Sequence, residues 1–304
     1  MTRPNPLRRA RLLERPALGG WLQIGHPAPA EIHARIGFDW VCADLEHGVI
    51  GIEALAGIFR ALSGFDCVPV ARVPVNDPVW IRRSLDAGAR GIIVPMINTA
   101  EEAERAVRAA KYPPRGERGF GYCRANWHGI DFAEHARTAN DDVAVILQIE
   151  HVRAIENLEG IAAVEDVDAL FIGPYDLSGS LGVPGELEHP KVLAALERFR
   201  AACRERGMAM GLHLVRPTAE SIRRAVGQGY ALLALGLDTV FMESAAQAAL
   251  AAARGCRAGP GAQASNGGAL SGLPEPPGPG RRSRPGSSGP FPRGPGGGKR
   301  PGRR

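Results

Sequence analysis

Eight short apolar runs recur along the chain, separated by segments of helical character. The runs are rich in Val, Ile and Leu, and most lack polar alternation, which is typical of strands covered on both faces. They comprise residues 20–25, 40–47, 68–74, 91–97, 143–150, 167–173, 209–215 and 231–238. The pattern predicts eight buried strands, each followed by a helix or loop.

The segments between these runs carry helix signals. Asp77 and Thr99 stand where an N-cap is expected, and Pro78 suits the first helical position. The segments expected to be helical are 27–37, 52–62, 77–88, 99–111, 152–163, 189–207 and 217–229, and the glycines expected to end three of them are Gly37, Gly88 and Gly229.

Eight strands that alternate with helices predict an α/β fold, the (β/α)8 TIM barrel. The chain has 304 residues, which is enough for one such barrel of about 250 residues. A doubly wound open sheet is the main rival, but no GxGxxG or P-loop motif follows an early run.

Composition divides the chain into three parts. Residues 1–18 form a short basic extension, residues 19–255 hold the predicted barrel, and residues 256–304 form a tail with 14 Gly and 10 Pro. The tail carries nine basic residues and one acid, a net charge of +8, so the remainder of the chain carries −3 and the basic character belongs to the tail. We expect this Gly/Pro/Arg-rich tail to be disordered, although a frameshifted reading would give a similar composition.

The cysteines and the hydropathy pattern bear on the cellular location. The five cysteines are scattered, odd in number and without a CxxC pair, which argues against a disulfide framework or zinc site and fits a reducing cytoplasm. No apolar run reaches the roughly 18–20 residues of a membrane span. We expect a cytoplasmic protein that does not enter a membrane.

Polar residues end several of the apolar runs, where the catalytic groups of a barrel lie. These residues are Asp44, Glu46, His47, Arg72, Gln148, Glu150, Gly173, Pro174, Tyr175 and Asp176. Glu150 and Asp176 follow neighbouring runs and would form an oxygen-rich site for Mg2+, Mn2+ or a similar cation. Solvated loop acids or helix caps are the alternative for this pair.

Two residues at this rim suit carbonyl chemistry. Arg72 could hold a carboxylate or stabilise an enolate oxygen, or form a structural ion pair. His47 could act as a general acid or base, with Asp44 and Glu46 near it in sequence, although a lone histidine is more often structural. His26 and His213 also lie near strand ends and rank below His47.

Lysine is scarce and unfavourably distributed. The chain contains Lys111, Lys191 and Lys299, and none of them lies in a predicted strand. A class I aldolase would need a lysine held there for a Schiff base. Carbonyl chemistry in this chain would therefore need a metal as its electron sink.

Several strings in order along the chain resemble the HpcH/HpaI family of class II pyruvate aldolases, from about residue 19 to 253. They are GFDWVCADLEHG, ARVPVNDP, LDAGARGIIVPMINTAEEAE, KYPPRGERGFG, ILQIE, VDALFIGPYDLSGSLG and LLALGLDT. The resemblance implies reversible cleavage of a 4-hydroxy-2-oxo acid to pyruvate, or a related 2-oxo acid, and an aldehyde. It also implies a divalent metal: Mg2+, Mn2+ or Co2+.

The resemblance assigns roles residue by residue. Glu150 and Asp176 resemble the metal ligands, and His47 resembles the catalytic acid/base with Asp44 beside it. Arg72 resembles the pyruvate-binding arginine. The substrate-binding set also includes Gln148, Gly173, Pro174, Tyr175 and Asp176, with the amides of the last two on the pyruvate carboxylate.

A supporting carboxylate in this family is often reached from a neighbouring subunit, and Asp86 resembles it. The resemblance therefore implies a homo-oligomer, a trimer or hexamer. The loop 112–130 places Arg118 and Arg124 as candidate contacts to the distal part of the substrate, with an oligomer contact as the alternative.

Two departures leave the distal substrate open. Tyr175 replaces the Ser or Ala usual before the metal-binding Asp, and His213 stands where a small or apolar residue is expected. Citrate-lyase-type relatives that act on CoA thioesters are the alternative enzyme class. A nucleic-acid or acidic-surface binder built on the basic tail is the non-enzyme alternative, and it is disfavoured because only Phe291 interleaves the tail's arginines.

Overall fold

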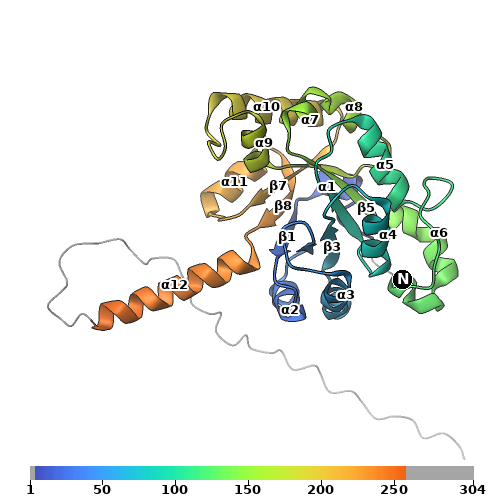
Figure 1. Cartoon of the computed structure of the whole chain (residues 1–304), viewed down its shortest axis with the longest axis horizontal. Coiled ribbons are helices and arrows are strands. Elements are labelled where there is room, and N and C mark those ends of the chain that lie inside the picture. The colour runs from blue at the N-terminus through green and yellow to red at the C-terminus, as the bar shows by residue number, and fades with distance from the viewer. Residues whose placement is uncertain (1–3, 258–304) are drawn as a thin grey trace, which may run out of the picture. The chain divides into compact units, whose positions relative to one another are not determined.

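Eight parallel strands close into a barrel in chain order, and the last strand pairs with the first (Figure 1). The computed structural model describes residues 4–257, and side chains over residues 4–255. The strands are β1 (Ala17–Leu22), β2 (Trp40–Asp44), β3 (Val68–Arg72), β4 (Gly91–Val94), β5 (Ala144–Ile149), β6 (Ala169–Ile172), β7 (Ala209–Leu214) and β8 (Tyr230–Leu235). The predicted (β/α)8 fold is confirmed.

Helices surround the strands in the order of the chain, from α2 and α3 round to α10 and α11 (Figure 1). Short 3-10 turns, η1 (Leu62–Gly64) and η2 (Arg124–Gly129), lie in two of the connections. The helices are α1 (Arg9–Glu14), α2 (Pro27–Ile36), α3 (Ile52–Ala61), α4 (Pro78–Asp86), α5 (Ala100–Ala110), α6 (Phe132–Asp142), α7 (Val152–Glu156), α8 (Leu158–Ala162), α9 (Pro174–Ser180), α10 (Pro190–Glu205), α11 (Ala219–Gly227) and α12 (Asp238–Arg257).

The predicted caps have the expected geometry. The Asp77 side chain accepts hydrogen bonds from two backbone amides of α4, and Thr99 caps α5 by accepting from the amide of Glu102. Gly37 ends α2 in the left-handed conformation at φ 105°, which glycine adopts without a Cβ clash. These local signals set the helix boundaries.

The first strand lies earlier than its apolar run predicts, at 17–22 instead of 20–25. Gly19 and Gly20 interrupt the apolar pattern, yet both belong to the strand. A Cβ on Gly19 would lie 2.0 Å from the Trp40 ring, so the close packing of β1 on β2 requires glycine there.

Two apolar layers fill the fold. The outer layer lies between strands and helices, and the inner layer fills the barrel itself. Trp21 packs in the inner layer, with its ring centroid 6.5 Å from that of Trp40 and 5.9 Å from that of Phe171. Gly211 leaves room for Phe171, because a Cβ there would lie 2.2 Å from that ring. The barrel is a packed core and not a pore.

The segment before β1 belongs to this core. Leu7 and Leu12 are fully buried in the inner layer, and the Arg8 Nε donates to Asp168 Oδ1 at 2.8 Å. The sequence predicts a short basic extension over residues 1–18, because the arginines obscure two apolar residues five positions apart. In the structure this segment closes the amino-terminal end of the barrel, and β1 begins inside it at Ala17.

The chain divides into two compact units, Met1–Arg254 and Gly255–Arg304. Apart from residues 256 and 257, which end α12, the predicted tail 256–304 lies outside the described residues. None of the helices described is both long enough and apolar enough to span a membrane.

Candidate active site

A polar cluster lies at the carboxyl ends of the strands. Side chains alternate between the two faces of a strand, and the polar positions share the face of the residues that fill the barrel. On β2, for example, Trp40 and Cys42 point inward, and Asp44 is the next residue on that face. The inward-facing residues at this end are Trp21, Asp44, Arg72, Gln148 and His213, and four of them line a cavity of about 210 Å3.

Asp44 and Arg72 are opposite each other in the β2–β3 register and form a two-pronged ion pair. Arg72 Nε lies 2.9 Å from Asp44 Oδ1, and Arg72 Nη2 lies 2.7 Å from Asp44 Oδ2. Asp44 also accepts from the Trp21 indole and from the backbone amides of Glu46 and His47. The carboxylate is therefore saturated and holds Arg72 in a fixed orientation.

The charges of this pair reinforce each other. Burial opposes ionisation of Asp44, but the hydrogen bonds and charge of Arg72 hold its pKa below the ordinary value. Burial likewise opposes the charge on Arg72. The hydrogen bonds and the negative charge of Asp44 have a larger effect than burial, so the pKa of Arg72 is raised. Asp44 accepts a hydrogen bond from the backbone amide of His47 and none from its imidazole. Asp44 therefore orients Arg72 and holds the loop after β2.

Glu46 joins the same cluster from that loop. Its Oε2 lies 2.9 Å from Arg72 Nη1. Burial raises the pKa of Glu46 despite the positive charge of Arg72, and the negative charges of Asp44 and Asp176 add to the rise. Glu46 was predicted to lie among the polar residues at the strand ends but was given no role of its own, and its contact with Arg72 makes it part of the site.

Glu150 is the most perturbed carboxyl group of the cluster. It is buried, its Oε1 accepts from the amide of Met96 at 2.7 Å, and its Oε2 accepts from Gln148 Nε2. Burial raises the pKa of Glu150 to about 7; the Met96 amide opposes this, and the charges of Glu46 and Asp176 add to it.

The loop after β4 points the backbone amide of Met96 at Glu150 by adopting an unusual conformation. Met96 has φ 54°, in the left-handed region that non-glycine residues rarely occupy. A strained backbone conformation of this kind persists only where the surrounding structure holds it in place. Such conformations cluster at functional sites. Sequence patterns carry no signal for it.

Asp176 lies in the first turn of α9, exposed at the rim. Gly173 precedes this helix, and a Cβ there would lie 2.9 Å from the Cβ of Glu150 and 3.0 Å from its Oε2. The glycine therefore lets the α9 loop approach Glu150. His47, Pro174 and Tyr175 line the same cavity together with Asp176.

The donor set fits a hard divalent cation. Burial, together with the negative charges of Glu46 and Asp176, raises the pKa of Glu150, and Arg72 is the single arginine or lysine among the described residues of the cavity wall. Gln148 Oε1 is buried and has no hydrogen-bond partner within the described chain. No group of three or more His, Cys, Asp or Glu over residues 4–255 has metal-holding geometry. A two-carboxylate site completed by water and substrate is the arrangement that Mg2+ tolerates.

Aromatic and apolar residues complete the cavity. Trp21 stacks on His213 with ring centroids 4.7 Å apart, and the Arg72 guanidinium lies 5.0 Å from the Trp21 ring. The remaining wall residues that sequence analysis did not assign to the site are Gln23, Phe171, Ile172, Val215 and Leu237. Counting alternate positions along β1 from Gly19 would have indicated Trp21 and Gln23.

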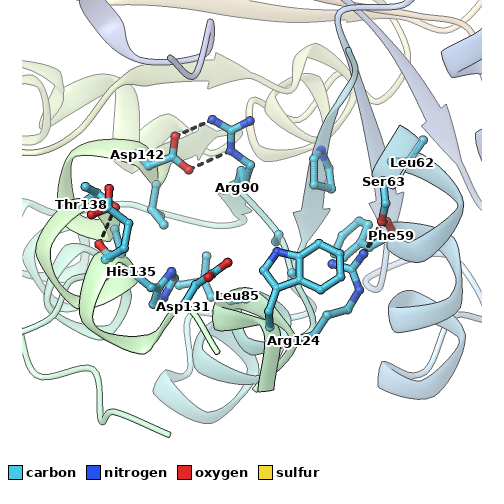
Figure 2. A pocket seen from close by; sticks show the side chains of 18 of the residues that line it. Phe59, Leu62, Ser63, Leu85, Arg90, Arg124, Asp131, His135, Thr138 and Asp142 are labelled. Atoms are coloured by element: carbon cyan, nitrogen blue, oxygen red, sulfur yellow. Dashed lines mark hydrogen bonds and ion pairs between the residues drawn. The ribbon is translucent and has the colours of Figure 1, made fainter. Parts of the chain in front are cut away.

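Three predicted site residues lie elsewhere in the chain. Asp86 ends α4, and Arg118 Nη2 donates to its Oδ1 at 2.7 Å. Arg124 donates to Ser63 Oγ at 2.6 Å and lines a second cavity, of about 290 Å3, near the amino-terminal ends of β3 to β5. Figure 2 shows Arg124 in this cavity with the Arg90–Asp142 ion pair across from it. Within one chain, these three residues do not reach the cavity at the carboxyl ends of the strands. The loop before α6 folds toward the amino-terminal end of the barrel.

The described lysines are also remote from the cavity. Lys111 is fully buried near the start of β5, where its Nζ donates to the carbonyls of Asn140 and Val143, both at 2.7 Å. Burial lowers the pKa of Lys111 to about 8. Lys191 is exposed at the start of α10, and Lys299 lies outside the described residues.

A (β/α)8 barrel with carboxylates and an arginine at the carboxyl ends of its strands defines the broad class of TIM-barrel enzymes. The HpcH/HpaI aldolase/citrate lyase family profile matches residues 18–245, and the chain belongs to this family. Its activity is accordingly that of an aldolase or lyase.

Individual relatives agree with this assignment. The chain is 41% identical to a 2-dehydro-3,6-dideoxy-6-sulfogluconate aldolase from Pseudomonas putida over 242 residues, 79% of this chain and 94% of the relative. It is 39% identical to a 4-hydroxy-2-oxo-heptane-1,7-dioate aldolase from Shigella boydii over 247 residues, 80% and 92% of the two chains. A crystal structure of a family member from Burkholderia cenocepacia has a TM-score of 0.77 at 36% identity and covers 82% of this chain and 99% of that chain.

Proposed function

We propose that this chain is a metal-dependent, class II aldolase that reversibly cleaves a 4-hydroxy-2-oxo acid into pyruvate, or a related 2-oxo acid, and an aldehyde. The observation that carries the proposal is the buried Glu150, whose pKa is raised by burial and by the negative charges of Glu46 and Asp176, beside a single wall arginine, Arg72, that already pairs with Asp44 and Glu46. Like charges in a buried site are costly unless a counter-ion offsets them. A divalent cation at this position would do so.

Glu150 and Asp176 are the residues that would hold Mg2+, Mn2+ or Co2+. When bound, the ion would supply a Lewis acid that polarises the substrate carbonyl. The Met96 amide and the Gln148 amide group both hold the Glu150 carboxylate, so its orientation is set before any ligand arrives.

Arg72 and the start of α9 would bind the 2-oxo acid. The fixed guanidinium offers positive charge to the carbonyl oxygen, which becomes an enolate oxygen on cleavage. The amides of Tyr175 and Asp176 belong to the first turn of α9, where N–H groups have no intrahelical acceptor, and they suit the substrate carboxylate.

His47 would move the proton. In the cleavage direction it takes the proton of the 4-hydroxyl, directly or through water, as the C3–C4 bond breaks and C4 becomes the aldehyde carbonyl. The bonding electrons pass to C3 and the carbonyl oxygen, and protonation of C3 then gives the 2-oxo acid. The Asp44–His47 amide contact at 3.2 Å holds the loop that carries the imidazole.

The proposal is tested by purified enzyme with pyruvate and a panel of aldehydes, with and without divalent metals. We expect carbon–carbon bond formation and metal-dependent deuterium exchange into the pyruvate methyl group. Borohydride with pyruvate should add no mass, because Lys111 and Lys191 do not line the cavity. Activity on CoA thioesters alone, with no pyruvate exchange, would contradict the proposal.

We also propose that the protein is a homo-oligomer. From Phe241 onward α12 leaves most of its side chains exposed, including Met242 at 61% and Leu250 at 51%. Strand β1 and the helices α2 and α11 also expose apolar side chains: Leu18, Ile32, Ile36 and Val226. Exposed apolar surface of this extent marks an interaction site.

Reciprocal packing of α12 on the barrel of another copy would cover both surfaces and would pair the copies. Pairing favours the hexamer over the trimer, and Asp86 would serve a neighbouring site. Light scattering on Leu250→Asp should show a smaller species, whereas Leu13→Asp, at a residue 58% exposed on α1, should not change it. An active wild-type monomer would contradict this part of the proposal.

A cytoplasmic location is part of the proposal. It is supported by Cys42, Cys67, Cys123 and Cys203, which are all free thiols. The tail predicted to be disordered is expected to be dispensable, so a chain ending near Gly255 should keep its turnover.

A further inference from the structure

A groove on the outer surface of the barrel, between α4 and α5, is lined mostly by arginines. The two helices pack side by side (Figure 1), and the groove between them has a volume of about 220 Å3. Arg82 comes from α4, and Arg105 and Arg108 lie three residues apart on one face of α5. The segment 117–119 completes the wall beyond the end of α5. The groove shares no lining residue with the cavity at the carboxyl ends of the strands.

The charges of this wall do not balance. Four of its residues are arginines, and Glu117 is the single acid among the described lining residues. Arg82 and Arg105 form no ion pair with any residue that the structure describes. Glu101, an exposed acid in the first turn of α5, interacts with Arg105 through its charge alone. The wall therefore carries a net positive charge.

The other two arginines are only partly neutralised. Arg108 lies 3.7 Å from Glu104 and 3.5 Å from Glu117, and both distances are long for an ion pair with hydrogen bonds. The side chain of Arg118 is 1% exposed and donates to Asp86 at 2.7 Å. The Nε of Arg118 has no hydrogen-bond partner within the described chain. The acids that contact these two arginines leave positive charge that the chain does not offset.

The composition of the wall indicates what it would bind. Guanidinium groups repel one another, and like charges on one helix face are unfavourable, so an anion between them would relieve the repulsion. Arginine binds the oxygens of a carboxylate or a phosphate group through paired hydrogen bonds. Pro78 and Ala109 are the only apolar side chains among the described wall residues, so a large apolar ligand would find little surface to contact. The wall suits a small ligand with several negative charges.

We propose that this groove is a second binding site, for a compact oxyanion with two or more negative charges, such as a phosphate ester or a tricarboxylate. Arg82 and Arg105 contact the ligand from the two helices, and Arg108 and Arg118 add positive charge around it. The proposal does not depend on the chemistry at the carboxyl ends of the strands, because the groove and that cavity have separate walls.

Calorimetric titration of the full chain measures this binding. Metal-free buffer is used, because pyrophosphate chelates divalent cations. The probes are pyrophosphate and tricarballylate, which represent the phosphate and carboxylate sources, and the monoanion acetate. We expect one site per chain with a Kd below about 1 mM for at least one polyanion, weakened by salt, and no binding of acetate. The polyanion that binds more tightly identifies the source.

Three variants locate the binding. Arg82→Gln and Arg105→Gln should each weaken it by about tenfold, because each removes a charge-assisted contact. Arg83→Gln is the matched control, since Arg83 adjoins Arg82 on α4 and is also exposed but does not line the groove. This control variant should bind as the wild type does. Circular dichroism checks that all three variants are folded.

Three results would overturn the proposal. One is that neither polyanion binds the wild type. Another is equal weakening by Arg83→Gln and Arg82→Gln, which would assign the effect to net charge and not to a site. The last is unchanged binding in Arg82→Gln and Arg105→Gln, which would place the anion elsewhere on the chain. No aldol substrate is present, so the proposed function and this proposal can fail independently.

Discussion

The two ends of the barrel bury charge in opposite ways. At the amino-terminal end, Asp168 accepts hydrogen bonds from an arginine and two backbone amides, and Lys111 donates to two carbonyls. At the carboxyl end, burial and like charges raise the pKa of Glu150 to about 7, and Gln148 Oε1 has no partner in the described chain. The amino-terminal end is satisfied by the chain itself, whereas Glu150 at the carboxyl end is the group that we propose a metal completes.

The difference separates stability from function. A buried charge that is paired and hydrogen-bonded supports the fold, whereas a buried charge without a counter-ion costs stability and persists where function requires it. Substitutions at the two ends should therefore have opposite signatures in activity and in stability.

The largest contrast is expected between Glu150→Gln and Asp168→Asn. Glu150→Gln should lower cleavage roughly 10³-fold, because it removes a charge that would hold the metal, while the protein stays folded. Asp168→Asn should leave the activity of the folded protein intact but lower the free energy of unfolding by about 1–3 kcal/mol through the lost ion pair with Arg8.

Activity assays and urea titrations of both variants check this contrast. An Asp168→Asn protein that is stable but inactive, or a Glu150→Gln protein that is unfolded, would remove the distinction between the two ends.

His47→Ala should slow aldol cleavage by roughly 10²–10⁴-fold, which is typical for loss of a general acid or base. Pyruvate enolisation should be spared more than in Glu150→Gln, because His47 would act on the hydroxyl of the aldehyde portion. Deuterium exchange into the pyruvate methyl group reports that step separately. Unaltered cleavage in His47→Ala would refute the role given to this residue.

Leu12→Ala tests the closure of the amino-terminal end. Leu12 is fully buried in the inner core, so the truncation should lower the free energy of unfolding by about 2–4 kcal/mol. Leu13→Ala, the exposed neighbour on α1, is the matched control and should change it little. Equal effects of Leu12→Ala and Leu13→Ala on the free energy of unfolding would mean that the segment before β1 does not contribute to the core. Turnover at low temperature should be normal in both.

The smallest effect concerns pH. The pKa of about 7 of Glu150 means that a metal must compete with a proton below neutrality. Apparent Mn2+ affinity should fall about tenfold for each pH unit below 7 and level off above it, as measured by calorimetric titration. A flat profile between pH 5 and 7 would argue against Glu150 as a ligand.

The same group makes a stability prediction of defined sign. Its folded pKa lies above its unfolded value, so the stability it contributes is present at low pH and lost as the pH rises from about 4.5 to about 7. Saturating metal should remove this dependence. Thermal unfolding of the metal-free protein across this range checks it.

The sequence could predict those site residues whose positions follow from the alternation of side chains along the strands. Asp44 and Arg72 both end buried strands on the inward face, so their pairing follows from the parallel register. Gly173 and Asp176 follow from the rule that loops after the strands build the site. Caps such as Asp77 follow from local chemistry.

Contacts set by long-range packing could not be predicted in this way. The left-handed Met96, which aims its amide at Glu150, has no local signature. The burial of Leu7 and Leu12 depends on a surface formed by distant strands. Arg118 donates a hydrogen bond to Asp86 because the loop 112–130 turns toward the amino-terminal end of the barrel. The composition of this loop does not indicate toward which end of the barrel it turns.

The requirement for a metal tests the central claim most directly. Enzyme freed of metal by chelation and verified by elemental analysis would be assayed for aldol cleavage and for deuterium exchange into pyruvate. The account predicts that both are lost and that Mg2+, Mn2+ or Co2+ restores both, because Glu150 and Asp176 have no other counter-ion than Arg72 among the described wall residues. Full activity of the verified metal-free enzyme, with borohydride trapping of pyruvate on Lys111 or Lys191, would contradict it and assign an imine mechanism instead.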